Sequence, residues 1–256
     1  MSAFLLKILA LFFMTTDHIG EFIPGTSIVL RYVGRLAYPI FLYCTLWSLY
    51  YTHDRIAYFK RMYIAGVVTA VLDLILNNVI EEPYCIITNN IFASLLLTGV
   101  IIHTIELLGN EPKAGLRWLR ALLVLQVVSI GMGTLLQGCF GLLGIQRFFG
   151  AVLPNVLWCE GGYFFIIMGV VLYFVKESKL KLSIAFSLFS FYYIAICYPH
   201  FSYEMIMKYN YQWMMIFALP FMLLYNYKRG KKVKWFFYIY YPVHFSLLYL
   251  AGNFLF

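Results

Sequence analysis

Apolar runs of spanning length alternate with short polar connections along the whole chain. They lie at 3–23, 33–52, 58–80, 85–108, 118–138, 155–175, 182–200, 211–227 and 235–255. One crossing of a bilayer core takes about 20 helical residues, so each run predicts a transmembrane helix. The pattern predicts an all-α, polytopic integral membrane bundle of about nine helices, with a range of about eight to ten. Residues 1–256 are then expected to form a single domain. The stretch 139–154 is too broken for a regular span, so we expect a re-entrant or interfacial segment there.

Composition excludes several classes of protein. The 256 residues are 63% hydrophobic and only 12% charged, whereas a soluble domain carries about 25% charged residues. A soluble enzyme, a disordered protein and a secreted disulfide scaffold are therefore excluded. The five cysteines are scattered and form no C-x-x-C pair, so we predict neither a metal site nor a disulfide framework.

The basic residues occur in clumps between the apolar runs, which fits membrane topology better than nucleic-acid binding. With the N-terminus inside, fifteen of the 19 lysines and arginines fall in cytoplasmic segments. Those left outside are Arg31, Arg35, Arg147 and Lys208. This asymmetry predicts an odd number of spans, an N-terminus in the cytoplasm and a multi-pass protein of the cell membrane, either a bacterial inner membrane or a plasma membrane.

The segment MTTDHIG places Asp17 and His18 at the outer end of the first helix. Ionisable residues inside a span are costly, and by default they mark a functional site or a buried pair. A carboxylate beside an imidazole can hold one tautomer, as a general base requires. Adjacent residues diverge by about 100° on a helix, so Asp17 can instead serve a different neighbour. The structural alternative is a polar helix end at the membrane interface.

Lys7 precedes His18 by eleven residues, close to three helical turns, so both should face one way about 16 Å apart. A cation near the cytosol and a base deeper on the same face would suit a long anionic donor. The alternative is a lysine that snorkels to the interface.

Arg31 and Arg35 lie at i, i+4 on one face of the second helix, followed by Pro39. Arginines there can bind a phosphate or carboxylate, or stabilise negative charge that develops on a carbonyl oxygen. Pairing with Asp17, Glu21 or Asp73 is the structural alternative, and both can hold at once.

Further polar residues lie on later helices. Tyr240 and His244 share a face around Pro242 in the last run, and a histidine near the bilayer centre marks a site or packs against a tyrosine. The others are Asp73, Asn77, Asn89, Asn90 and Glu160. The asparagines either line a polar cavity or form interhelical hydrogen bonds.

Taken together, the segments MTTDHIG, RYVGRLAYPIF, TNNIF, EGGY, YNYKRGK and FYIYYPVH resemble the TraX family, in order and over nearly the whole chain. The specific blocks are D-H-I-G, G-R-L-A-Y-P-I-F and F-Y-x-x-Y-P-x-H. The family is named for a conjugative-plasmid membrane protein that acetylates the N-terminus of pilin. It looks distantly similar to the membrane type-3 acyltransferases, in which a basic residue, ten residues and a histidine mark the first helix. Lys7 and His18 have this spacing, with Lys in place of the usual Arg.

The resemblance implies transfer of an acetyl group from cytosolic acetyl-CoA to an amine or hydroxyl of a membrane-presented peptide, glycan or lipid. The catalytic residues are then His18, assisted by Asp17, with His244 and Tyr240. The donor-binding residues are Lys7, Arg31, Arg35 and Asn89. The chain departs from the family in its penultimate loop, where Asn226-Tyr227 replaces Asn-Gly.

Two other functions compete with an acetyltransferase. A proton-coupled small-solute transporter could use Asp17, His18, Asp73, Glu160 and His244 as a relay. That hypothesis leaves the spacing of Lys7 and His18 unexplained, and no internal repeat supports it. The third hypothesis is a noncatalytic membrane chaperone for a peptide.

Overall fold

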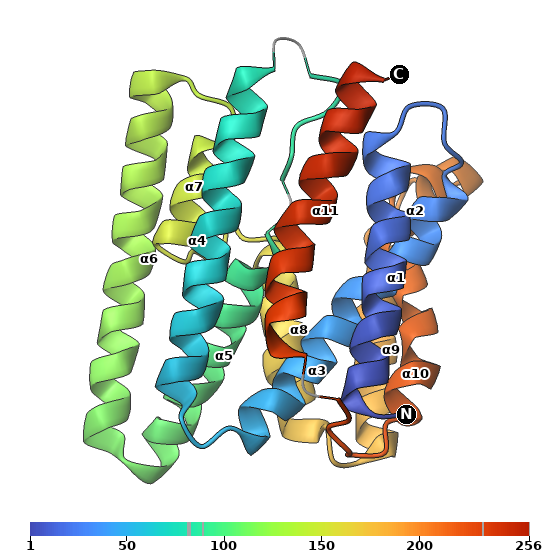
Figure 1. Ribbon diagram of the computed structural model, residues 1–256. Helices are drawn as coiled ribbons and strands as arrows, with labels where there is room; N and C mark the ends of the chain where they lie inside the picture. The colour runs from blue at the N-terminus through green and yellow to red at the C-terminus, as the bar shows by residue number, and fades with distance from the viewer. Residues whose placement is uncertain (81–82, 89, 232, 256) are drawn as a thin grey trace. The chain divides into compact units, whose positions relative to one another are not determined.

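The computed structural model describes residues 1–80, 83–88, 90–231 and 233–255, and the regular secondary structure of these residues is entirely helical (Figure 1). The helices form two compact units. The first comprises Met1–Trp47 with Val171–Phe256, and the second comprises Ser48–Val170. The expectation of a single domain stays a prediction.

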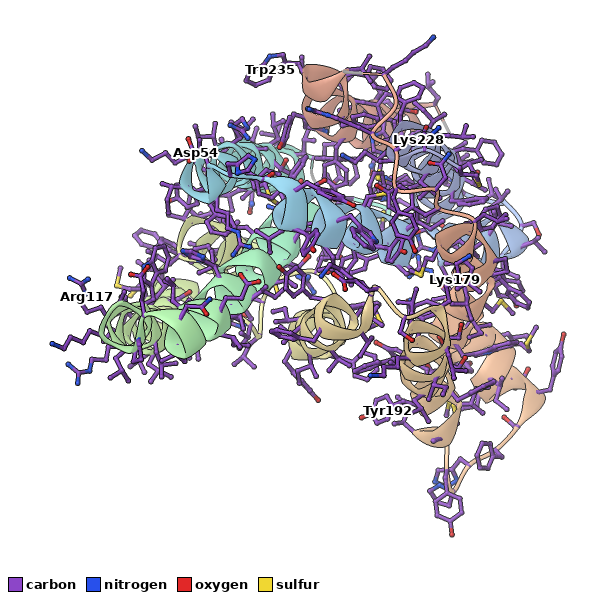
Figure 2. The ribbon with its side chains drawn as sticks, turned by 90° about the horizontal axis from the view of Figure 1, so that it is seen from below. Asp54, Arg117, Lys179, Tyr192, Lys228 and Trp235 are labelled. Atoms are coloured by element: carbon purple, nitrogen blue, oxygen red, sulfur yellow. The ribbon has the colours of Figure 1, made fainter. Side chains whose placement is uncertain are left out.

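The first unit is built around α1 (Ala3–Phe22). Its other long helices are α3 (Ala37–Tyr51), α9 (Lys179–Ala195) and α11 (Lys234–Phe254), and it also takes in the end of α8 (Gly162–Val175). Four short elements complete it: α2 (Val29–Gly34), a π-helix (Met205–Tyr209), a 3-10 helix (Tyr211–Ala218) and α10 (Leu219–Leu223). In the view of Figure 2, Lys179 marks the start of α9 and Lys228 lies on the connection before α11.

The second unit contains α4 (Arg55–Val79), α5 (Ile91–Asn110), α6 (Pro112–Phe140), α7 (Ile145–Val152) and the start of α8. Side-chain caps fix where two of these helices begin. Asp54 accepts a hydrogen bond from the amide of Ala57 at 2.9 Å, and Asn90 accepts one from Ala93 at 3.4 Å. Each cap satisfies an amide that has no partner within its helix.

Helix starts and breaks differ from the predicted spans for local reasons. The helix of the fourth run, α5, begins at Ile91 because Asn90 caps it. The helix of the sixth run begins only at Gly162, because the preceding Gly161 has a φ of 73°, which does not fit a right-handed helix. The eighth run, expected at 211–227, is a 3-10 helix followed by the five-residue α10.

The broken stretch 139–154 contains one short helix, α7. Gly141 and Gly144, with φ of 61° and 80°, separate α7 from α6. This supports the expectation of an irregular segment.

Among the described residues, four helices have the length and apolar composition needed to cross a membrane: α1, α4, α5 and α6. The chain is therefore an all-helical membrane protein.

Close backbone approach joins α1 to its neighbours α2 and α11. A Cβ on Gly34 would lie 2.2 Å from Cβ of Asp17, and one on Gly252 would lie 1.8 Å from the carbonyl oxygen of Phe22. Only glycine fits at these two positions. Both contacts bring the C-terminal half of α1, which carries Asp17 and His18, against its partner helices.

Candidate active site

A pair of histidines joins α1 to α11 in the first unit. Nδ1 of His18 lies 2.8 Å from Nε2 of His244. The two rings are nearly parallel, with an interplanar angle of 8° and centroids 4.8 Å apart. Both side chains are buried, so the hydrogen bond forms where water competes little.

The surrounding contacts assign the tautomers of this pair. Nδ1 of His244 lies 2.9 Å from the carbonyl oxygen of Tyr240. Because a carbonyl only accepts, Nδ1 of His244 carries the proton, and Nε2 of the neutral ring is an acceptor. Nδ1 of His18 therefore donates to His244. In the neutral His18 ring the lone pair then resides on Nε2, which is the form a general base needs.

Tyr240 extends the pair along α11. Its ring stacks on His244 with centroids 4.9 Å apart. Oγ1 of Thr15 donates to the carbonyl of Leu11 at 2.8 Å, so the hydroxyl of Tyr240, also 2.8 Å away, is the donor to Thr15. Thr15 lies one turn before His18, and this second bond holds the same faces of α1 and α11 together.

Asp17 serves other partners than the imidazole. Its carboxylate forms an ion pair with Arg35, and Oδ1 lies 3.2 Å from a guanidinium nitrogen of Arg31. These contacts fit the alternative in which Asp17 serves a different neighbour, because Nδ1 of His18 contacts His244, and assistance of His18 by Asp17 stays a prediction. The physical reason is the divergence of adjacent side chains on a helix.

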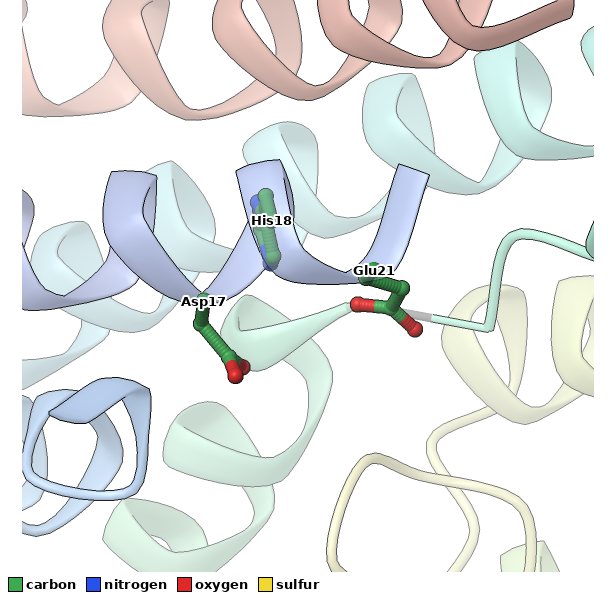
Figure 3. A group of neighbouring side chains, drawn as sticks. All are labelled: Asp17, His18 and Glu21. Atoms are coloured by element: carbon green, nitrogen blue, oxygen red, sulfur yellow. The ribbon is translucent and has the colours of Figure 1, made fainter. Parts of the chain in front are cut away.

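Glu21 completes the charged cluster, with Oε2 2.8 Å from a guanidinium nitrogen of Arg31. Figure 3 shows the carboxyl groups of Asp17 and Glu21 pointing to one side of α1, whereas the ring of His18 overlaps the ribbon. Burial opposes ionisation of Arg31, but the carboxylates of Asp17 and Glu21 raise its pKa above the usual value. Arg31 therefore stays charged.

Two residues of the 3-10 helix also bind the arginines. Arg31 Nε donates to the hydroxyl of Tyr211 at 3.4 Å, and Arg35 donates to Oε1 of Gln212 at 3.1 Å. The arginines thus form the ion pairs with Asp17 and Glu21 that were expected as the structural alternative to ligand binding. Their role in donor binding stays a prediction.

Ligand atoms of Asp17, His18 and Glu21 lie within 4.8 Å of one another, a spacing that could hold a metal ion. Both carboxylates already contact guanidinium groups, which a cation would have to displace. The prediction of no metal site therefore stands untested.

Lys7 and His18 both face α11, as their spacing predicts. The ammonium of Lys7 lies 5.5 Å from the ring centroid of Phe237, and His18 contacts His244. Lys7 and the histidine pair thus lie along the same contact between α1 and α11.

Other predicted residues lie elsewhere. Asn89 lies outside the described residues. Asp73, Asn77, Asn90 and Glu160 belong to the second unit. Both ends of the Asn77 amide bond to the backbone of Ile87, at 2.8 and 2.9 Å, and Asn90 donates to the carbonyl of Gly66 at 2.9 Å. These contacts support the interpretation of the asparagines as hydrogen-bonding links between segments.

Sequence reasoning missed Thr15 and Gln212, and it gave no role to Tyr211. Thr15 lies at i−3 from His18, so it shares a face with the candidate base. That spacing could have identified it. The 3-10 helix is almost 180 residues from the arginines in sequence, and no local pattern indicates the contact.

A family model described as TraX protein matches residues 2–251. No curated protein and no solved structure matches the chain.

Proposed function

The chain belongs to the TraX family, and from this premise we propose that it is an integral-membrane acetyltransferase that uses acetyl-CoA as its acyl-donor substrate. The acceptor is an amine or hydroxyl on a membrane-presented peptide, such as a pilin-like N-terminus, or on a glycan or lipid. The observation that carries the proposal is the buried pair of His18 and His244, whose contacts leave the lone pair of the neutral His18 ring on Nε2.

His18 acts as the general base. Nε2 takes the proton of the acceptor while the acceptor nitrogen or oxygen bonds to the carbonyl carbon of the thioester. The C–S bond then breaks, and the proton held by His18 goes to the departing thiolate. His244 accepts the hydrogen bond from Nδ1 of His18 and so keeps the lone pair on Nε2.

The remaining residues position the acyl donor and stabilise the negative charge that develops during transfer. Arg31 or Arg35 stabilises the oxyanion or holds a donor phosphate, since each guanidinium is fixed by carboxylates and by the 3-10 helix. Asp17 positions these arginines. Lys7 and the basic connection before α11 attract the negative charges of the donor. The chemistry of these cations fits a phosphate-rich substrate.

The test is label transfer from radiolabelled acetyl-CoA to native membranes by the purified protein. His18→Ala should abolish transfer, whereas His200→Ala, at an exposed histidine in the same unit, should retain it. Transfer that survives His18→Ala would contradict the mechanism. Absence of acetyl-CoA binding would favour the proton-coupled transporter, and peptide binding without turnover would favour the chaperone.

A further inference from the structure

The connection between α10 and α11 contains a strained tyrosine. Tyr227 has a φ of 60°, and among the described residues it alone combines positive φ with a side chain. This left-handed conformation is unfavourable for residues with a Cβ. A conformation of this kind persists only where the surrounding structure fixes it.

Backbone hydrogen bonds from the first residues of the chain hold this connection in place. The amide of Asn226 donates to the carbonyl of Met1 at 2.8 Å, and the amide of Ala3 donates to the carbonyl of Lys228 at 2.8 Å. Gly230 lies so close to Ser2 that a Cβ there would lie 2.7 Å from the serine hydroxyl oxygen. Hydrogen bonds and close contacts with the start of α1 therefore hold the connection on both sides of Tyr227.

In this conformation the ring of Tyr227 lies against two buried aromatic side chains. Its centroid lies 5.0 Å from that of Trp47 and 5.2 Å from that of Tyr225. Trp47 and Tyr225 are buried, whereas Tyr227 is 43% exposed. The ammonium of the buried Lys176 lies 3.8 Å from the ring centroid of Tyr173 and 5.5 Å from that of Trp47. Tyr227 thus exposes part of its ring to solvent while it packs against buried aromatic side chains, one of which also contacts a lysine ammonium.

Three exposed cations follow this ring within four residues: Lys228, Arg229 and Lys231. A nucleotide combines the two features that this segment offers, because a base stacks on an aromatic ring and phosphates bind cations. A phosphate of a lipid headgroup would use the cations, but it carries no flat base that could stack on the ring. The exposed ring therefore favours a nucleotide.

We propose that Tyr227 and the cations Lys228, Arg229 and Lys231 bind the nucleotide end of the acyl donor, with the adenine stacked on Tyr227 and its phosphates on the cations. The proposal rests on the proposed function only in taking a nucleotide thioester as donor.

The first test measures binding of 3′-phosphoadenosine 5′-phosphate to the purified full chain by calorimetry. Tyr227→Gly removes the ring and relieves the strain, so the fold should be retained. We expect this variant to weaken binding about tenfold, the scale of one base stacked on one aromatic ring. Tyr227→Phe should restore most of the affinity, and Tyr203→Ala, at an exposed tyrosine of the same unit, should show none of this loss.

Two results would overturn the nucleotide site. One is equal binding of the probe by the wild type and Tyr227→Gly, including no binding by either. The other is inorganic pyrophosphate displacing the probe as well as the unlabelled nucleotide does, because the cations alone would then account for binding and a lipid headgroup would serve equally.

A second readout separates this inference from the proposed function. Acetyl transfer is compared between acetyl-CoA and S-acetyl-N-acetylcysteamine, which lacks the nucleotide. In the wild type the truncated donor should have the higher KM, and Tyr227→Gly should reduce the ratio of the two KM values about tenfold. If neither donor supports transfer while the probe still binds, the proposed function fails and the nucleotide site stands. If transfer occurs and the ratio is unchanged, the nucleotide site fails alone.

Discussion

Nδ1 of His18 and Nε2 of His244 lie 2.8 Å apart although 226 positions separate the two residues in the chain. The contact joins the middle of the last helix to the C-terminal end of the first. In the proposed mechanism His244 therefore orients the candidate base, a role that was expected of the adjacent carboxylate.

His244→Phe should reduce acetyl transfer by about 10²-fold or more, the scale of general-base catalysis. Phenylalanine keeps a ring for stacking but cannot accept the hydrogen bond from His18. His244→Gln offers an amide oxygen as an acceptor, so it should retain more activity than His244→Phe. The measurement is the rate of label transfer at saturating acetyl-CoA.

The pH profile distinguishes this orienting role from a purely structural one. Transfer should rise with pH as His18 loses its proton, and the pH at half-maximal rate should change in His244→Phe because the two rings are coupled. If His244→Phe and His244→Gln lose activity equally and keep the wild-type profile, His244 acts through packing alone.

Tyr240 and Thr15 should contribute a measurable coupling energy across the same contact between α1 and α11. Tyr240→Phe and Thr15→Val each remove the hydroxyl–hydroxyl bond of 2.8 Å, while the phenyl ring can still stack on His244. A double-mutant cycle on unfolding in detergent should give about 0.6 kcal/mol, typical of hydrogen bonds between membrane helices. Additive effects of the two substitutions would show that this bond does not stabilise the helix pair.

Much of the helical architecture could be predicted because bilayer thickness fixes the length of an apolar run. The long runs at 3–23 and 58–80 correspond to α1 and α4. Helix starts at Ile91 and Gly162 depend on local capping and on positive φ, which a hydropathy pattern does not encode.

The candidate site was predictable only in part. Helical spacing placed Lys7 and His18 on one face, and both contact α11. Spacing also brought Arg31 and Arg35 together, but their carboxylate partners follow from how α2 packs on α1 at Gly34. The departure at Tyr227 from the family's Asn-Gly has a structural counterpart, because its φ of 60° is one that glycine adopts readily.

Asp17→Asn should destabilise the protein more than Glu21→Gln does. Asp17 contacts both Arg31 and Arg35, and removing one partner of a buried ion pair costs about 3–5 kcal/mol. In Glu21→Gln, Arg31 still has the carboxylate of Asp17. The measurement is the unfolding temperature in detergent.

The matched control for this comparison is Glu204→Gln. It breaks the exposed i, i+4 pair with Lys208, whose charged atoms lie 2.8 Å apart. Exposed ion pairs contribute little to stability, so its unfolding temperature should equal that of the wild type. If Asp17→Asn behaves like Glu204→Gln, the charged cluster does not stabilise the packing of α2 on α1.

Gly34→Ala and Gly252→Ala should both destabilise the first unit and reduce acetyl transfer. The added methyl group would overlap Asp17 in one case and the carbonyl of Phe22 in the other, at 2.2 and 1.8 Å. Forcing a methyl group into a packed interface costs about 1–3 kcal/mol, and it would push α2 or α11 away from α1. Gly131→Ala on α6 is the control, because a Cβ there meets nothing within 4 Å. Alanine favours a helix by about 1 kcal/mol over glycine, so this variant should be at least as stable as the wild type.

The unfolding temperature and the transfer rate should fall together in Gly34→Ala and Gly252→Ala. Wild-type activity in Gly252→Ala would show that transfer tolerates displacement of α11. It would contradict the proposal that His244 on α11 keeps the lone pair of His18 on Nε2.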